Sequence, residues 1–232
     1  MNKYNLKIEK DLLWIASIDG YDYLIDTGCP TSGRIDDSPN TVTIEGKQYP
    51  MYNIRVDREG LNDCLGCKID GIIGMNILSR RGFSINKEDM TVCFDGTIGD
   101  KQLKSIAFEN TGFIVISDGI TINGHGIGPI LDTGAHIGYV CTGILENLEP
   151  IGKYEDFNPV LGRMSGDLYS SKVRINNIDF NMKIGIAADR VQQELKKLNC
   201  GAIIGIPLEV SRAYFDFVDN KIYFDVSKSR SN

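Results

Sequence analysis

The sequence YLIDTG at residues 23–28 returns as PILDTG at residues 129–134, 106 positions further along the chain. Each copy is an apolar run that ends in Asp, Thr and Gly. A single Asp-Thr-Gly is a weak signal, because a chain of this length contains one by chance in roughly a few per cent of cases. Two copies, each at the end of an apolar run and each opening a similar half, indicate a repeat.

The rest of each half repeats at a larger spacing. DGIIG at residues 70–74 returns as GAIIG at residues 201–205, and VTIEGKQY at residues 42–49 aligns with VRINNIDF at residues 173–180. Both pairs lie 131 positions apart, so the offset grows by 25 residues (131 minus 106) after the Asp-Thr-Gly. The chain is therefore an internal duplication with one insertion in its second half, from about residue 135 to residue 171.

This set of motifs resembles the aspartic proteases, which carry apolar-apolar-Asp-Thr-Gly followed by apolar-apolar-Gly in each half. The segment IIGMNIL at residues 72–78 is similar to the retropepsin segment after the flap. Two halves in one chain resemble the bilobal pepsins, with each half nearer to retropepsin size. The resemblance covers nearly the whole chain. It implies a mainly β, pepsin- or retropepsin-like acid protease fold with two pseudo-symmetric β-barrel-like lobes and short helices.

Turn-forming residues and the repeat together divide the chain into three parts. We expect an N-terminal lobe at residues 1–97, a linker at residues 98–105 and a C-terminal lobe at residues 106–232. Apolar runs predict strands before each Asp-Thr-Gly and a hairpin within residues 41–56. Short helices are expected at residues 57–68, 75–80, 142–148 and 191–198.

The two Asp residues of the repeat, Asp26 and Asp132, supply what peptide hydrolysis needs. One carboxylate activates a water as a base, and one carboxylic acid protonates the leaving nitrogen. Two Asp side chains a few ångströms apart do not both ionise easily, so such a pair holds one proton over a wide pH span. We expect the two halves to pack about a pseudo-two-fold axis and to bring these two carboxyl groups together.

The neighbouring residues fit the same role. The Gly after each Asp-Thr lets the backbone turn sharply and its N–H approach the carboxylate. The Gly that ends each Ile-Ile-Gly lets the chain cross closely behind the catalytic loop, and the resemblance implies that the two Thr hydroxyls bind across the two-fold axis. The supporting residues are Thr27, Gly28, Gly74, Thr133, Gly134 and Gly205.

The position after each Asp-Thr-Gly differs from the pepsin pattern. Pepsin-like proteases often carry Ser or Thr there, whose hydroxyl stabilises the ionised carboxylate, whereas this chain has Cys29 and Ala135. Loss of a hydrogen bond to the charged form raises a carboxyl pKa. We therefore expect a pH optimum less acidic than that of pepsin. Cys29 is expected to be a small buried residue in preference to a redox-sensitive thiol.

In this family the peptide adds as an extended strand between the catalytic Asp residues and a flap. Pepsins carry their one flap in the first half, but the surplus residues here lie in the second half. We therefore expect the only flap at about residues 160–172, as a hairpin around a Gly-rich centre. Its expected hinges are Gly162 and Gly166, and its expected substrate contacts are Met164 and Tyr169. A surface hairpin without substrate contact is the alternative.

Composition narrows the possible partners. With 232 residues, 42% hydrophobic and 24% charged, the chain is typical of a soluble globular protein. Its net charge of -6 disfavours nucleic acids and anionic membranes as partners. It has neither an apolar run that could span a bilayer nor an N-terminal secretory signal, so we expect a cytoplasmic protein. The expected partner is an extended peptide or protein substrate, bound by a monomer without a cofactor.

The cysteines and histidines do not favour another chemistry. The pair Cys64-x-x-Cys67 has no second pair and no nearby His in the sequence, and the equivalent residues of the second half are leucines. We therefore expect packing and no metal site. His125 and His136 are the two histidines, and no Gly-x-Ser-x-Gly accompanies them. A haloacid-dehalogenase-type phosphatase would need a second Asp where each repeat has Gly.

An alternative from another class stays open. In this alternative the chain is a protease fold that has lost turnover and serves as a peptide-binding or regulatory module. The short loop after Asp26 and the unusual Cys29 suggest it. The intact Asp, Thr and Gly in both halves favour hydrolysis.

Overall fold

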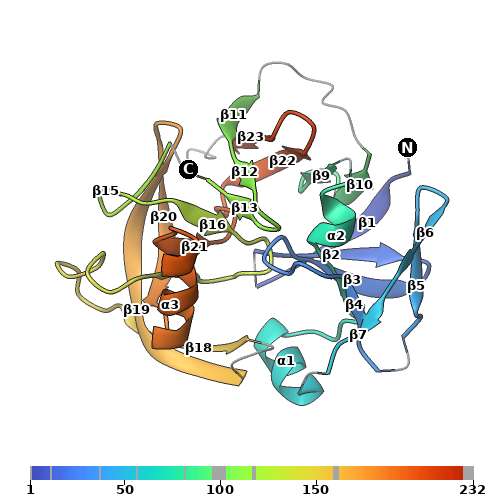
Figure 1. The fold of residues 1–232 in the computed structure, drawn as a ribbon, viewed down its shortest axis with the longest axis horizontal. Coiled ribbons are helices and arrows are strands. Elements are labelled where there is room, and N and C mark those ends of the chain that lie inside the picture. The colour runs from blue at the N-terminus through green and yellow to red at the C-terminus, as the bar shows by residue number, and fades with distance from the viewer. Residues whose placement is uncertain are drawn as a thin grey trace.

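The computed structural model describes residues 2–10, 12–36, 38–55, 57–80, 82–95, 103–116, 119–158 and 162–226. These residues form a mainly β structure with two large sheets, one two-stranded sheet and three short helices, which confirms the predicted β class (Figure 1). None of the helices within these ranges is long and apolar enough to cross a membrane.

The first half, up to residue 95, contains ten strands and two helices among its described residues. In chain order they are β1 (Tyr4–Glu9), β2 (Leu13–Ile18), β3 (Tyr21–Ile25), β4 (Gly33–Arg34), β5 (Thr41–Ile44), β6 (Lys47–Pro50), β7 (Tyr52–Asn53), α1 (Arg58–Leu65), β8 (Gly71–Ile73), α2 (Met75–Leu78), β9 (Phe83–Asn86) and β10 (Thr91–Phe94).

The second half has longer strands and one helix among its described residues. Its elements are β11 (Lys104–Ala107), β12 (Glu109–Asn110), β13 (Ile114–Val115), β14 (Ile120–Ile122), β15 (His125–Gly126), β16 (Pro129–Leu131), β17 (Gly138–Val140), β18 (Gly152–Asn158), β19 (Gly162–Ile175), β20 (Ile178–Ile186), α3 (Asp189–Lys197), β21 (Ala202–Ile204), β22 (Val210–Asp216) and β23 (Lys221–Val226). β11 begins inside the predicted linker, and residues 96–102 lie outside the described residues.

The two halves share one sheet, in which equivalent strands of the repeat lie at equivalent distances on either side of the junction between the halves. Part of its strand order is β11-β23-β22-β9-β10-β1, where β22 is the repeat of β9 and β23 the repeat of β10. β9 and β22 pair antiparallel with Phe83 opposite Phe215, and these two rings stack 4.3 Å apart. Antiparallel pairing of equivalent strands is what a local two-fold axis produces, so the halves join along that axis.

Each half places its Asp-Thr-Gly at the end of a buried strand that pairs parallel with the Ile-Ile-Gly strand. β3 pairs with β8, and β16 pairs with β21 in the same way. β8 and β16 are buried along their whole length, and so is most of β3 and β21. Continuous apolar runs are expected where strands are covered on both faces. The repeat in the sequence is therefore a repeat of these three-dimensional units.

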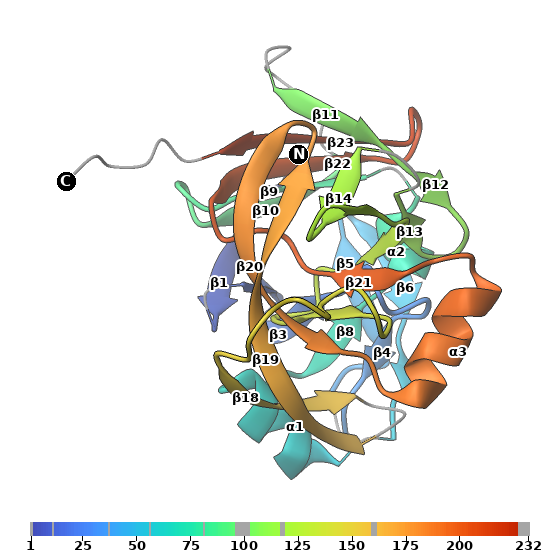
Figure 2. The same cartoon turned by 90° about the vertical axis from the view of Figure 1, so that its left-hand side faces the viewer.

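The inserted residues of the second half form a long hairpin that the first half lacks. β18 pairs antiparallel with the first part of β19, from Gly152 opposite Leu168 to Asn158 opposite Gly162. β19 then continues into pairing with β20, so it forms one long curved strand (Figure 2). The far part of this hairpin reaches α1 of the first half (Figure 1).

The helices lie where the sequence predicts them, with one exception. α1 begins after Asp57, whose carboxylate accepts from the Gly60 N–H, and ends at Gly66 in a left-handed conformation. The predicted helix at residues 142–148 is wrong, because that segment forms successive turns. Gly143 has a φ of +100° there, which interrupts a right-handed helix. Thr142 is held instead by the Gln192 side chain of α3.

Candidate active site

The repeated Asp residues lie in two equivalent loops, directly after β3 and β16. The Asp26 N–H donates to the Ile73 carbonyl at 3.0 Å, and the Asp132 N–H donates to the Ile204 carbonyl at 2.8 Å. The Ile-Ile-Gly strand of each half therefore fixes the backbone of its own Asp.

Within each loop, the N–H of the glycine donates to the neighbouring carboxylate. Gly28 donates to Asp26 Oδ1 and Gly134 donates to Asp132 Oδ1, both at 2.8 Å. Each glycine also faces the Asp of the opposite loop. A Cβ added to Gly134 would lie 2.7 Å from the Asp26 carboxyl carbon, and one added to Gly28 would overlap the Asp132 carboxyl. The two loops thus approach so closely that only glycine fits at these positions.

The two threonines form a reciprocal lock beneath the carboxyl groups. The Thr27 hydroxyl donates to the Leu131 carbonyl at 2.8 Å, and the Thr133 hydroxyl donates to the Ile25 carbonyl at 2.7 Å. Each hydroxyl also accepts from the backbone N–H of the other threonine at 3.0 Å. Both side chains are fully buried, so all four bonds are protected from water. This exchange ties the two Asp loops into one rigid unit.

The glycines of the Ile-Ile-Gly segments lie behind these loops. A Cβ at Gly74 would meet the Cys29 carbonyl oxygen at 2.5 Å, and one at Gly205 would overlap the Ala135 carbonyl oxygen. These are the close chain crossings that the sequence analysis expects at both positions.

The environment raises the pKa of both carboxyl groups. Burial is the main cause for Asp26, and the charge of Asp132 and their mutual hydrogen bond raise its pKa further. Burial also raises the pKa of Asp132, whereas the N–H groups of Gly134 and Gly28 and the Asp26 hydroxyl act in the opposite direction. The two groups therefore titrate as a pair that keeps one proton above the range of an ordinary Asp. One neutral acid and one carboxylate are thus present together.

Cys29 and Ala135 follow the two Asp-Thr-Gly sequences, and each is the last residue of a turn that begins at the Asp. Their N–H groups donate to the carbonyls of Asp26 and Asp132, so the backbone is alike in both halves. Burial, and then the charge of Asp26, raise the pKa of the Cys29 thiol to about 12. A raised pKa favours the protonated thiol. The expected burial is met only in part, because Cys29 is half-buried. Among the described residues no serine, threonine or tyrosine hydroxyl donates to either Asp carboxylate.

A cavity of about 260 Å³ opens above the two carboxyl groups. Apolar side chains of both halves line it: Leu24, Leu61, Leu65, Ile72, Met164, Val191 and Ile203. The remaining surface includes a few polar groups around the Asp pair. This combination of an apolar cavity with convergent polar groups is typical of ligand sites.

The hairpin predicted as a flap is present, but its geometry differs from the expectation. The predicted turn at the Gly-rich centre is wrong, because residues 162–169 lie within the single strand β19. Met164 reaches the cavity with the Asp pair. Gly166 pairs opposite Tyr154, where a Cβ would come within 2.9 Å of that ring, so close packing and not a hinge explains it. Tyr169, in the middle of β19, packs against the core and does not line the cavity.

Gly162, the other expected hinge, opens β19 opposite Asn158, the last residue of β18. Residues 159–161 between them lie outside the described residues. The expected range of residues 160–172 therefore falls mostly on β19, the second strand of the hairpin. β18 was not expected as a strand, because its alternation is weak and it has no counterpart in the first half.

Sequence reasoning missed several polar and aromatic residues beside the Asp pair. Tyr139 of β17 donates to Asp156 Oδ2, and its ring packs edge-on against Tyr154 of β18. Asp156 also accepts from the Cys64 thiol at 3.0 Å. Burial lowers the pKa of His136, although Asp156 partly opposes this change. Of these residues, only His136 has a position in the sequence that indicates a place near the Asp pair, because it follows Asp132 by four residues. Asp156 lies in the inserted segment, which has no counterpart in the first half to compare it with.

A scan against models of protein families finds no match, and a search of curated proteins finds no significant match either.

Proposed function

We propose that this chain is an aspartic endopeptidase with a pepsin- or retropepsin-like fold, in which one chain supplies both halves. The single observation that carries the proposal is the pair formed by Asp26 and Asp132, held by the reciprocal bonds of Thr27 and Thr133. Such a lock orients two acidic groups that would otherwise repel each other. A fold that only binds peptides has no need of this arrangement.

In the proposed reaction a water molecule lies between the two carboxyl groups. The ionised carboxylate takes a proton from this water as it attacks the peptide carbonyl carbon. The neutral carboxyl group donates its proton to the carbonyl oxygen, and the leaving nitrogen is protonated when the tetrahedral intermediate collapses. Because the proton belongs to the pair, the roles of base and acid are shared between the two residues. No covalent intermediate forms with the protein.

The cavity favours an extended peptide with apolar side chains beside the scissile bond. Its walls are contributed by α1 of the first half, by α3 and by the β18–β19 hairpin. Met164 of β19 lines the same cavity as the two carboxyl groups. Strand-like binding between the hairpin and the Asp pair provides backbone hydrogen bonds, and the apolar walls select side chains. Since both Asp residues come from one chain, we propose that the monomer is the active form.

The test is hydrolysis of a peptide library and of a denatured protein, with cleavage sites read by mass spectrometry. We expect cleavage between apolar residues, inhibition by a hydroxyl-bearing transition-state mimic such as pepstatin, and loss of cleavage in Asp132→Asn. A wild-type protein that binds peptides with the same affinity as Asp132→Asn, and cleaves none between pH 3 and pH 8, would overturn the proposal. That result would instead identify a peptide-binding module.

A further inference from the structure

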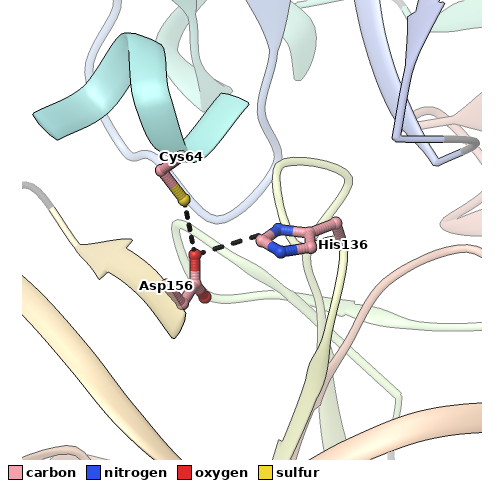
Figure 3. A group of neighbouring side chains, drawn as sticks. All are labelled: Cys64, His136 and Asp156. Atoms are coloured by element: carbon pink, nitrogen blue, oxygen red, sulfur yellow. Dashed lines mark hydrogen bonds and ion pairs between the residues drawn. The ribbon is translucent and has the colours of Figure 1, made fainter. Parts of the chain in front are cut away.

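Three potential metal ligands meet at the edge of the cavity, each from a different part of the chain (Figure 3). Cys64 lies in α1, His136 follows the Asp132 loop, and Asp156 lies in β18. One ligand atom from each residue lies within 4.8 Å of the other two. The Cys64 Sγ is 3.0 Å and the His136 Nδ1 is 3.8 Å from the same Asp156 oxygen, Oδ1.

The surroundings present this set of atoms in a fixed geometry. Tyr139 donates its hydroxyl proton to the other oxygen, Asp156 Oδ2, and so orients the carboxylate with Oδ1 toward the cysteine and the histidine. A hydrogen-bonded neighbour of this kind positions metal-binding carboxylates in known sites. The side chains of His136 and Asp156 are each 13% exposed, so water reaches them only in part.

We propose that Cys64, His136 and Asp156 bind a zinc ion whose fourth position faces the cavity of the Asp pair. Tetrahedral zinc holds sulfur at about 2.3 Å and nitrogen or oxygen at about 2.0 Å, which places neighbouring ligand atoms about 3.3–3.5 Å apart. The separations of 3.0 and 3.8 Å lie on either side of this range, so small side-chain rotations suffice.

The ligand types favour zinc over magnesium or calcium. A thiolate and an imidazole prefer borderline-soft ions, whereas Mg²⁺ and Ca²⁺ require mostly oxygen ligands. The thiolate and the carboxylate together neutralise the charge of a divalent ion. On binding, the Cys64 thiol loses to solvent the proton that it donates to Asp156, and the Zn–S bond replaces this S–H···O hydrogen bond.

Zinc at this position would close the cavity. α1 belongs to the first half and β18 to the inserted hairpin, and in the metal-free protein the hydrogen bond from Cys64 to Asp156 is one of the polar links between them. The exposed ion pair between Asp63 of α1 and Arg163 of β19 is another link between α1 and the hairpin. Replacing one hydrogen bond by two metal-ligand bonds holds the hairpin against α1 and blocks an extended peptide. This consequence rests on the proposed peptidase function, whereas the metal site does not.

Metal binding is tested first, without reference to activity. The metal-free, full-length protein is titrated with Zn²⁺ in competition with a chromophoric chelator, and with Co²⁺ followed by absorption. We expect one ion per chain and an intense thiolate-to-cobalt charge-transfer band. Cys64→Ser should remove this band and weaken Zn²⁺ binding by at least about 10- to 100-fold, the loss that follows when even a neighbour that orients a metal ligand is changed. Cys67→Ser is the matched control, because Cys67 follows α1 but is not among the clustered ligands.

The outcomes separate the possibilities. Failure of the wild-type protein to bind Zn²⁺ at micromolar concentration overturns the site, as does unchanged binding or an unchanged band in Cys64→Ser. With peptidase activity present, Zn²⁺ should inhibit the wild-type and Cys67→Ser proteins, a chelator should reverse this, and Cys64→Ser should resist it. Equal inhibition of Cys64→Ser would place the inhibiting ion on the Asp pair. It would overturn the inference that zinc at Cys64 closes the cavity to peptides. A protein that binds zinc through Cys64 but never cleaves peptides keeps the site and loses only the proposed function.

Discussion

The first half of the chain runs from β4 to β5 through residues 35–40, whereas the second half runs from β17 to the equivalent point of β19 through residues 141–171. These are 6 residues against 31, and the difference of 25 is the change of offset between the two repeats. The hairpin that follows, β5–β6 in the first half and β19–β20 in the second, has the same kind of turn in both halves. Its turn residues, Glu45-Gly46 and Asn176-Asn177, all have positive φ.

This comparison separates two kinds of structure in one site. The two Asp loops, residues 26–29 and 132–135, form a symmetric floor, because the threonine and glycine hydrogen bonds of one loop recur in the other. The β18–β19 hairpin forms a one-sided cover, because the described residues of the first half contain no equivalent of it, and it reaches over to α1 of the first half (Figures 1 and 2). Symmetry therefore predicts equal effects for paired substitutions in the floor, and unequal effects for substitutions around the cover.

The largest effect is expected from the Asp pair. Asp26→Asn and Asp132→Asn should each lower kcat/KM by about 10³-fold or more, since either change removes one partner of the proton transfer. Losses that differ by more than about tenfold between the two variants would contradict a shared role. Measurement of kcat/KM on one peptide substrate checks this.

The same variants should be more stable than the wild-type protein at neutral pH. In the unfolded chain an Asp ionises near pH 3.9, but in the folded protein burial raises the pKa of the pair. The unfolded state therefore binds fewer protons between these pKa values, and stability falls as pH rises through that window. Replacing one Asp by the neutral Asn removes this loss. We expect Tm at pH 7 to rise by a few degrees, and no rise at pH 3.

The threonine lock provides the second test of symmetry. Thr27→Ala and Thr133→Ala should each lower the free energy of unfolding by about 2–4 kcal/mol, because each leaves a buried carbonyl and a buried N–H without a partner. Each change removes two different bonds of the lock, but the loss of either pair loosens the contact on which the other pair depends, so the double variant should lose less than the sum. Urea unfolding measures this. Thr43→Ala in β5, outside the lock, is the control and should change stability by less than about 0.5 kcal/mol.

The symmetric floor is also the part of the site that the sequence predicts well. Its residues recur at fixed offsets, so each assignment of an Asp, Thr or Gly in one half is supported by the other half. Close chain crossings allow only glycine, so the sequence has glycine at both equivalent positions, Gly74 and Gly205. The β class of the fold follows from the same apolar runs, which the structure buries in β8 and β16.

The one-sided cover is harder to predict, for a physical reason. Its residues are not repeated, and they contact partners that are far away in the sequence. Tyr154 illustrates this: it packs over Gly166 and Gly185, so these glycines accommodate an aromatic ring and do not mark a turn or a hinge. A glycine in a strand can mark either a bend of the chain or a close approach by another group, and local sequence does not distinguish these two roles. Asp156 and Cys64 are 92 residues apart and meet only because the hairpin crosses to the other half.

A smaller effect is expected when a hydroxyl is added beside the Asp pair. Ala135→Ser offers a donor to the ionised Asp132 carboxylate, and a hydrogen bond to a charged group is worth about 1.5–3 kcal/mol. Because this favours the ionised form, the pKa falls, and the acid limb of the kcat/KM profile should move down by about one pH unit or more. Cys29→Ser should produce the same shift from the first half. Ala107→Ser on the exposed face of β11 is the control, and an unchanged profile in both floor variants would show that the missing hydroxyls do not set the pH optimum.

The smallest effect is expected at the cover, where the symmetry is broken. Met164 lines the cavity from β19, so Met164→Ala should remove an apolar contact to bound peptide and raise KM about threefold to tenfold, with kcat nearly unchanged. Ser165→Ala is the matched control, because the neighbouring residue of a strand points to the opposite face and Ser165 is exposed. Its KM should equal that of the wild-type protein. Equal KM values for all three proteins would mean that the hairpin is a surface feature without substrate contact, and that the second half gained 25 residues for another purpose. A fall in kcat at constant KM in Met164→Ala would instead indicate that the hairpin positions the peptide over the Asp pair and contributes little to its affinity.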